Sequence, residues 1–318
     1  MRRAVVLALA IASCVPSGEE ADPRGALGLA TVPSPIARGE SFVTKDGWTV
    51  HVEELVVLAA ISGNALDPAS EDVLFPTARA SSRQGPYLFK ASRPETFVAP
   101  GLPVGPGGVW LPYHWLVLGP SRRTNEPDEM ETRNVEPALV ARFHLPSESF
   151  EPTLSTTWTA ALGPSILLIA RGEKGGRVVR IDFAFRGAVR PFNEIPLEIR
   201  ANTVNQAPLA VAAESLFSGP TGYELRCEVD DAGVLKPRSP TLSSTSELVF
   251  DDLASADADG DGKLSAAELR RPLIPPRCEC CSSVDDESVR NFTSSMAALL
   301  EARSGELLLQ GREPSGGP

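Results

Sequence analysis

The sequence lacks the short motifs that mark the common enzyme active sites. It contains no G-x-S-x-G nucleophile turn, no H-E-x-x-H zinc motif, no phosphate-binding P-loop and no dinucleotide-binding glycine pattern. Histidine is scarce: the chain has 3, namely His51, His114 and His144, and none is close to another in the sequence. These absences predict a protein that is not an enzyme. A fold that gathered the histidines with carboxylates in a pocket would reverse this prediction.

Long hydrophobic runs and an excess of positive charge are lacking as well. Beyond the N-terminus, no segment reaches the roughly eighteen consecutive apolar residues that a transmembrane helix needs. The chain has 30 Lys and Arg against 41 Asp and Glu, which gives a net charge of −11. This charge would repel the phosphates of a nucleic acid, so we expect no nucleic-acid partner. The same charge is consistent with the binding of cations.

Helical periodicity is also scarce, since no long helix-like pattern precedes residue 244. The chain instead holds 29 prolines and 26 glycines between short apolar segments. Trp48, Val50 and Val52 alternate with polar residues, which is the period of a half-buried strand. Between 165 and 185, an apolar segment, a glycine-rich turn and a second alternating segment predict an antiparallel hairpin. We therefore predict a mainly β fold, with an antiparallel β-sandwich-like domain over residues 39–240.

The most informative feature of the chain is an acidic segment, DADGDGKLSAAE, at residues 257–268. Its pattern, D-x-D-x-D-G-x-L-S-x-x-E, fills every position of an EF-hand calcium loop. Ca²⁺ prefers about six to eight oxygen ligands at flexible distances, and alternating carboxylates in a tight turn supply them. Gly262 permits the sharp turn, and Leu264 is the apolar position that packs inward. The predicted ligands are Asp257, Asp259, Asp261, the backbone carbonyl of Lys263, Ser265 and the bidentate Glu268.

Short helices are expected on both sides of this acidic loop. Ser244 and Glu247 form a capping-box pattern that predicts the start of an incoming helix. Ser265 and Glu268 form a second such pattern, which predicts the cap of an outgoing helix. Pro272 cannot lie inside a helix and keeps the outgoing one short. We therefore predict a small α-helical EF-hand segment over residues 241–312.

The sequence shows one loop with a full set of ligands, whereas EF-hands usually occur in pairs. A degenerate partner is one interpretation of the tail. In that case residues 284–303 would form a helix with Met296 and Leu300 on its apolar face, and residues 307–309 would pair beside Leu264. The alternative interpretation is a simple packing helix followed by a frayed tail.

The N-terminus has the features of an export signal. Residues 1–13 combine two arginines with a short apolar run that is too short to span a bilayer permanently. The run ends in Ile-Ala-Ser-Cys at residues 11–14, which resembles the lipobox of bacterial lipoproteins. This resemblance implies that Cys14 is acylated and that the mature chain is anchored to a membrane by its lipid. The alternative is an ordinary signal peptide that ends near a cysteine.

Residues 14–38 are rich in Pro, Gly and Ala and show little periodicity. We predict that they form a flexible tether that holds a folded body away from the membrane. By analogy with bacterial lipoproteins, Val15 in place of an aspartate favours the outer membrane over the inner one.

The cysteines beyond Cys14 are even in number, which in an exported chain predicts disulfides. Adjacent Cys280 and Cys281 bridge each other only with severe strain. Cys227 is therefore expected to pair with one member of the later cluster, while the remaining two pair locally. The alternative is a thiolate metal site at residues 278–281. The disulfide candidates are Cys227, Cys278, Cys280 and Cys281.

The segments 44–50 (TKDGWTV) and 207–217, together with the lipobox and the acidic loop, resemble predicted lipoproteins of large-genome Gram-negative bacteria. In those proteins a β domain precedes a single C-terminal EF-hand. The resemblance implies no known reaction. From the lipobox and the four loop carboxylates we predict a non-enzymatic, membrane-anchored protein that faces the periplasm or the cell surface, in which Ca²⁺ orders the C-terminal segment. The resemblance names no protein partner. A fainter similarity in strand layout, to copper-associated periplasmic β-sandwich proteins, implies an alternative: a β domain that binds copper, zinc or a partner.

Overall fold

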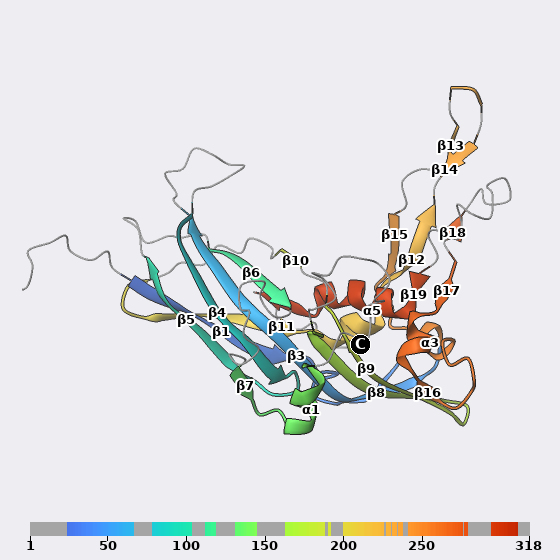
Figure 1. The fold of residues 1–318 in the computed structure, drawn as a ribbon, viewed down its shortest axis with the longest axis horizontal. Helices are drawn as coiled ribbons and strands as arrows, with labels where there is room; N and C mark the ends of the chain where they lie inside the picture. Colours follow the sequence, from blue (N-terminus) through green and yellow to red (C-terminus); the bar gives the residue numbers. More distant parts are fainter. Residues whose placement is uncertain are drawn as a thin grey trace, which may run out of the picture.

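The computed structural model describes residues 24–66, 78–103, 112–118, 131–144, 163–187, 190–191, 200–225, 227–229, 231–233, 235–237, 241–275, 277–278 and 294–310. These residues form a mainly β protein, as the strand patterns predicted. Two larger sheets make up the body, and the smaller sheets and most of the short helices are formed by residues that follow position 212 (Figure 1). The sheets are mixed, because parallel pairs occur among the antiparallel ones.

A nine-stranded sheet is built around one long strand, β3 (Thr49–Leu66). This strand pairs antiparallel with β4 (Ala78–Lys90), β6 (Pro112–Leu118) and β8 (Ile166–Lys174). The remaining strands are β2 (Phe42–Val43), β7 (Glu131–Arg133), β9 (Arg177–Phe185), β10 (Arg190–Pro191) and β16 (Lys263–Leu264). The alternation predicted from residue 48 onward is confirmed, since Val50 and Val52 are buried while His51 is exposed.

The predicted hairpin of residues 165–185 is also confirmed. Strands β8 and β9 pair along their whole length, from Ile166 opposite Phe185 to Lys174 opposite Arg177. They are joined by Gly175 and Gly176, whose φ angles of 57° and 84° suit a two-residue hairpin turn. Strand β8 also pairs with residues 49–57 of β3, so the hairpin is an integral part of the nine-stranded sheet (Figure 1).

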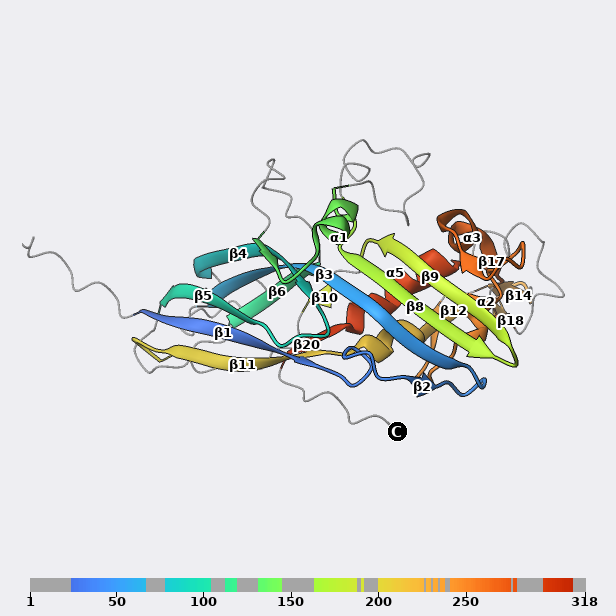
Figure 2. The same ribbon diagram turned by 90° about the horizontal axis from the view of Figure 1, so that it is seen from below.

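A four-stranded sheet has the order β20 (Leu308–Gln310), β11 (Val204–Val211), β1 (Arg24–Pro33) and β5 (Thr96–Pro103). Strands β1 and β11 run parallel and lie side by side (Figure 2). The flexible tether predicted for residues 14–38 is therefore wrong from residue 24 onward. Leu29, Ile36 and Ala37 are buried, and burial of apolar side chains outweighs the loop-like composition of this segment.

One hydrophobic core joins the two sheets and the C-terminal segment. It includes side chains of β1, β3, β8, β9 and β11, and also Met296, Leu299 and Leu300 of helix α5 (Met296–Arg303). The predicted apolar face of this helix is thus confirmed. The predicted start at residue 284 is not, because residues 294–295 form a short strand, and residues 284–293 lie outside the described part of the chain. The predicted boundary between residues 240 and 241 does not separate two cores, because the same core continues across it.

The opposite face of the nine-stranded sheet is covered by helix α1 (Pro137–Arg142). Leu139 and Val140 pack against a second cluster that includes Val56, Leu88 and Leu167. Helices α1 and α5 therefore lie on opposite sides of the sheet (Figure 1).

The remaining elements are short. They are η2 (Ala213–Phe217), β12 (Gly219–Leu225), β13 (Cys227–Val229), β14 (Leu235–Pro237), β15 (Thr241–Thr245), α2 (Asp251–Ala254), α3 (Ala266–Arg270), β17 (Pro272–Ile274), β18 (Arg277–Cys278), β19 (Ser294–Ser295) and η3 (Ser304–Glu306). None of the helices in the described part of the chain is both long and apolar enough to pass through a membrane.

Candidate metal centre

Three of the predicted ligands converge in the acidic loop. One carboxylate oxygen from each of Asp257, Asp259 and Asp261 lies within 4.8 Å of the other two. Asp259 and Asp261 are exposed, whereas the side chain of Asp257 is only 1% exposed. Oxygen donors of this kind, close together and mostly negative, match the chemistry of a hard divalent cation.

The backbone of the loop holds these carboxylates in place. The N–H of Asp261 donates to Oδ1 of Asp259 at 3.0 Å, and the N–H of Lys263 donates to Oδ1 of Asp261 at 2.7 Å. Gly262 has a φ of 78°, in the left-handed region, and a Cβ added there would lie 2.7 Å from the carbonyl oxygen of Val178. The glycine predicted for the sharp turn is therefore required by both its conformation and its neighbour.

Ser265 and Glu268 form the predicted capping box at the start of α3. Oε2 of Glu268 accepts from the N–H of Ser265 at 2.9 Å, and Oε1 accepts from the N–H of Ala258 at 2.9 Å. These bonds, above all the one from the Ser265 backbone, hold the pKa of Glu268 below its ordinary value. The structure thus places Glu268 across the loop without bringing its oxygens into the close group of three aspartates.

Strand β16 joins the acidic loop to the edge of the nine-stranded sheet. Lys263 and Leu264 pair parallel with Arg180 and Ile181 of β9, and the N–H of Arg180 donates to the carbonyl of Gly262 at 2.9 Å. Leu264 is buried, as predicted. The predicted pairing of residues 307–309 beside Leu264 is wrong, because β20 pairs with β11 instead. In the described part of the chain, the pairing partner of β16 is β9 of the nine-stranded sheet.

A pair of full EF-hand helices is not seen in the described part of the chain, so the predicted α-helical segment is only partly correct. Helix α2 has 4 residues and α3 has 5. The incoming helix does not begin at Ser244, because residues 241–245 form β15 and pair with β12. Glu247 does not complete a capping box either: its carboxylate pairs with Lys45, and its N–H donates to Oγ1 of Thr245 at 3.1 Å.

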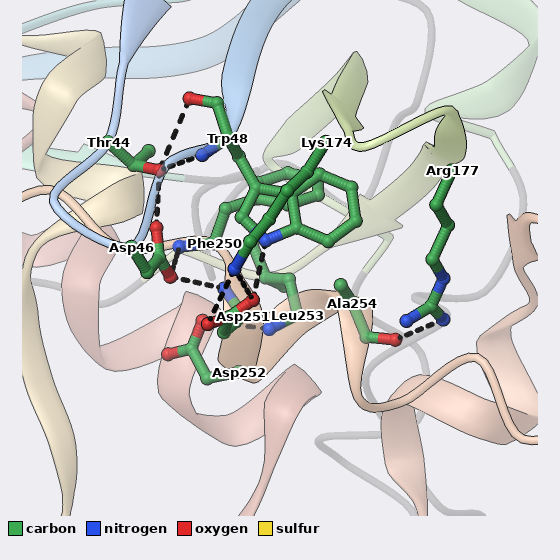
Figure 3. Close-up of polar contacts among 10 residues, drawn as sticks. All are labelled: Thr44, Asp46, Trp48, Lys174, Arg177, Phe250, Asp251, Asp252, Leu253 and Ala254. Carbon is green, nitrogen blue, oxygen red and sulfur yellow. Dashed lines mark hydrogen bonds and ion pairs between the residues drawn. The ribbon is translucent and has the colours of Figure 1, made fainter.

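A turn distant in the sequence caps α2 instead (Figure 3). Oδ2 of Asp46 accepts from the N–H of Phe250 at 2.8 Å and from the N–H of Asp251 at 2.6 Å. Oγ1 of Thr44 donates to the other oxygen of Asp46 and accepts from the N–H of Trp48 at 3.0 Å. The segment 44–50, one of those that carry the resemblance to predicted lipoproteins, therefore caps and supports the N-terminal end of α2.

Aromatic packing strengthens this contact. The rings of Trp48 and Phe250 lie 5.1 Å apart, and both side chains are buried. The indole N–H of Trp48 donates to Oδ1 of Asp251 at 2.6 Å, and Nζ of Lys174 bonds the same oxygen at 3.0 Å (Figure 3). These donors lower the pKa of Asp251, with the indole bond as the largest cause. A Cβ on Gly172 would overlap the Phe250 ring, so a glycine is needed in β8 at this point.

Two arginines connect the loop region to the rest of the fold. Nη2 of Arg177, at the start of β9, donates to Oδ2 of Asp257 at 2.9 Å and to the carbonyl of Ala254 at 3.0 Å. Buried Arg303 of α5 bonds Oδ2 of Asp252 at 2.5 Å. Asp251 stays exposed in α2, whereas Asp252 is partly buried by its bond to Arg303. No sequence motif signals the contacts of Arg177 and Asp46, because each links segments far apart in the chain.

The histidines do not form a metal site among the described residues. His51 is exposed on β3, where its Nδ1 lies 3.4 Å from Oγ of Ser41, and His144 is exposed after α1. Of His114, the structure describes only the backbone, in β6. The single group of close metal-ligating atoms found in the described part of the chain is the aspartate group.

The cysteine predictions fall largely outside the described residues. This applies to Cys14, Cys280 and Cys281, and to the side chains of Cys227 and Cys278. The backbone register places Cys278 of β18 opposite Leu225 of β12, two residues before Cys227. Lipidation at Cys14 and the disulfides among the others stay predictions.

No family model, curated protein or solved structure matches this chain. The function is therefore inferred from the residues of the site itself. Its donor set fits a hard divalent cation: three carboxylates converge, the Lys263 carbonyl and the Ser265 hydroxyl belong to the same loop, and Glu268 lies across it. No soft thiolate or imidazole ligand belongs to this group within the described residues.

Proposed function

We propose that this chain is a calcium-binding, lipid-anchored exported protein without catalytic activity, in which Ca²⁺ orders the C-terminal segment. The ligands would be Asp257, Asp259, Asp261, Lys263 through its carbonyl, Ser265 and Glu268. We further propose that the body is a sandwich-like β domain and that the acidic loop is a single EF-hand variant. Its flanking helices are reduced to one turn or slightly more, and β9 serves as its pairing partner.

The observation that supports this function best is the convergence of the three aspartates in a loop that is already turned. Their oxygens lie within 4.8 Å of one another, although three negative charges at this separation repel. The positive-φ glycine and the sheet pairing of β16 fix the turn in the same place that the sequence motif requires. A bound divalent cation would relieve the repulsion and use each of these features.

The ion would act structurally, by mass action. Extracellular calcium modules bind with dissociation constants of about 10⁻⁴–10⁻³ M, which suffices where calcium is plentiful. A ligand that binds only the folded state at 100 times its dissociation constant stabilises it by about 2.7 kcal/mol. For a chain of this size, each kcal/mol raises the melting temperature by roughly 2–4 °C. Calcium should therefore raise the melting temperature of the purified protein by roughly 5–10 °C.

The decisive experiment compares melting temperatures in EDTA and in calcium for the wild type and for Glu268→Gln. The glutamine keeps one acceptor for the capping box but removes the bidentate carboxylate, so the calcium-induced shift should fall to a small fraction of its wild-type size. A slight loss in EDTA is also expected, because both oxygens of Glu268 accept backbone bonds.

Glu247→Gln is the matched control, since it removes the same charge from an exposed residue outside the loop. Its calcium-induced shift should equal that of the wild type. Equal shifts in Glu268→Gln and in this control would refute the proposed site.

Metal analysis separates this function from the copper or zinc alternative. After EDTA treatment and dialysis against a mixture of calcium, zinc and copper salts, the protein should retain calcium near one per chain and release it again on EDTA treatment. Zinc or copper retained near one per chain, with no calcium, would instead favour a soft-metal site in the β domain.

The membrane anchor is proposed from the lipobox sequence at residues 11–14. Mass spectrometry of the protein extracted from membranes should find an acylated Cys14 as the first residue. An unmodified N-terminus at another position would contradict the anchor without affecting the calcium site.

A further inference from the structure

Arg177 is positioned to influence the acidic loop directly. It follows the Gly175–Gly176 turn and begins β9, so the hairpin brings its guanidinium group toward the end of α2 (Figure 3). The same Nη2 atom bonds the carbonyl of Ala254 at 3.0 Å and Oδ2 of Asp257 at 2.9 Å. The guanidinium carbon also lies 5.9 Å from the centre of the Trp48 ring. These contacts hold the positive charge beside the first predicted calcium ligand.

Asp257 is the most enclosed carboxylate of the loop. Its side chain is 1% exposed, whereas that of Arg177 is 48% exposed. One oxygen of Asp257 receives the N–H of Gly262 at 3.4 Å, and the other receives Arg177. An enclosed carboxylate without a cationic partner is costly, so Arg177 stabilises the loop in the ion-free state.

A bound divalent cation would compete with this arrangement. It needs an oxygen of Asp257 and would place two positive charges a few ångströms from the guanidinium, and like charges at that separation repel strongly in a partly buried site. The presence of Arg177 therefore lowers the free energy of the ion-free state and raises that of the bound state. Both effects act against calcium binding.

We propose that Arg177 sets the calcium affinity of the acidic loop, as the counter-ion of Asp257 that an incoming Ca²⁺ must displace or repel. The inference rests on the proposed calcium function. On this proposal, the β8–β9 hairpin keeps the acidic loop folded when no ion is bound. It also weakens calcium binding, so that bound calcium exchanges with calcium in solution.

The opposite role is a well-defined alternative. Residues that hydrogen-bond a metal ligand from behind often orient it, and their removal commonly weakens metal binding by about 10–100-fold. If Arg177 acted in this way, its substitution would weaken calcium binding. The two roles thus predict changes of opposite sign.

Calorimetric titration of the purified protein with CaCl₂ tests the proposal with the wild type, Arg177→Gln and Arg180→Gln. The Arg177 side chain is about half-exposed and its charge is partly screened, so its removal should strengthen calcium binding by about fivefold, the equivalent of roughly 1 kcal/mol. In EDTA the melting temperature of Arg177→Gln should fall below that of the wild type, and the calcium-induced shift should grow.

Arg180→Gln controls for general charge effects. Arg180 lies on the same strand, and its side chain is 56% exposed. Its Nη2 atom lies 4.0 Å from Oε1 of Glu53, which is not a carboxylate of the acidic loop. Its substitution should strengthen calcium binding by less than twofold, since an exposed charge is screened. Equal effects of the two substitutions would overturn the specific role of Arg177.

The outcomes separate the two proposals. If the wild type does not bind calcium, the proposed function itself fails. If the wild type binds calcium and Arg177→Gln binds it equally or more weakly, only the role of Arg177 fails. Should Arg177→Gln not fold in EDTA, Arg177→Lys replaces it in the titration. That variant keeps the charge but loses the planar group, and is expected to strengthen binding by about twofold.

Discussion

Replacement of Asp46 by alanine should destabilise the protein through a helix more than 200 positions away. Oδ2 of Asp46 accepts two backbone N–H groups at the start of α2, with a sequence separation of 204 residues for Phe250 and 205 for Asp251. Loss of a helix-capping side chain costs about 0.5–2 kcal/mol. Because two donors lose a charged acceptor here, we expect the upper end, about 2 kcal/mol.

The expected fall in melting temperature follows from the size of the protein. At roughly 2–4 °C per kcal/mol, Asp46→Ala should melt about 4–8 °C below the wild type in differential scanning calorimetry. Asp46→Asn should lose less than half as much, because its amide oxygen still accepts hydrogen bonds. The calcium-induced shift should be retained in both variants, since Arg177 and β16 hold the acidic loop independently of this cap.

Glu40→Ala is the control for the loss of a surface carboxylate. Glu40 pairs with Arg38, and both side chains are at least half-exposed, so its removal should change the melting temperature by less than about 2 °C. If Asp46→Ala melted within 1 °C of this control, the turn at residues 44–48 would not be what holds the incoming helix, and the reasoning would be refuted.

Two further predictions test the same region. Gly172→Ala should lower the free energy of unfolding in urea by about 1–3 kcal/mol, because the added Cβ would lie 2.7 Å from Cζ of Phe250. An unchanged free energy of unfolding would show that the Phe250 ring has room to move. The pKa of Asp251 is lowered in the folded state, chiefly because its carboxylate accepts the Trp48 indole N–H. The ionised Asp251 therefore stabilises the fold at pH values above its unfolded pKa of about 3.9. This stabilisation is lost as the pH falls through the lower pKa of the folded state. The melting temperature of Asp251→Asn should therefore fall less steeply than that of the wild type between about pH 5 and pH 3, and parallel curves would contradict this assignment.

The sequence predicted best those features that depend on neighbouring residues. The alternation in β3 and in the β8–β9 hairpin is local, and so are the glycine turn of the acidic loop and the Ser265 capping box. Each of these patterns fixes a backbone conformation through contacts within a few residues. Their structures followed from the sequence without knowledge of the rest of the fold.

The features that were predicted wrongly depend on distant partners. The tether predicted for residues 14–38 is replaced from residue 24 onward by β1, because this segment pairs with β11 and β5. The pairing predicted between residues 307–309 and Leu264 does not form, because β20 pairs with β11 instead. Residues 241–245 became a strand because β12 was available for pairing.

The candidate site shows the same division. The identity of the carboxylates and their convergence in one turn could be predicted from their spacing. The ion pair of Asp257 with Arg177 and the edge pairing of Leu264 with Ile181 could not, since both depend on where the hairpin lies. The short length of α2 also could not be predicted, because its cap comes from Asp46.

Because β16 pairs with the sheet, the acidic loop cannot be separated from the β domain without loss of its supports. A fragment that begins near residue 241 would lose the Asp46 cap, the Trp48 contact and the whole of β9 together. The calcium affinity measured on such a peptide would therefore not represent that of the loop in the intact chain. Grafting the loop into another scaffold would therefore require transfer of the β8–β9 hairpin as well.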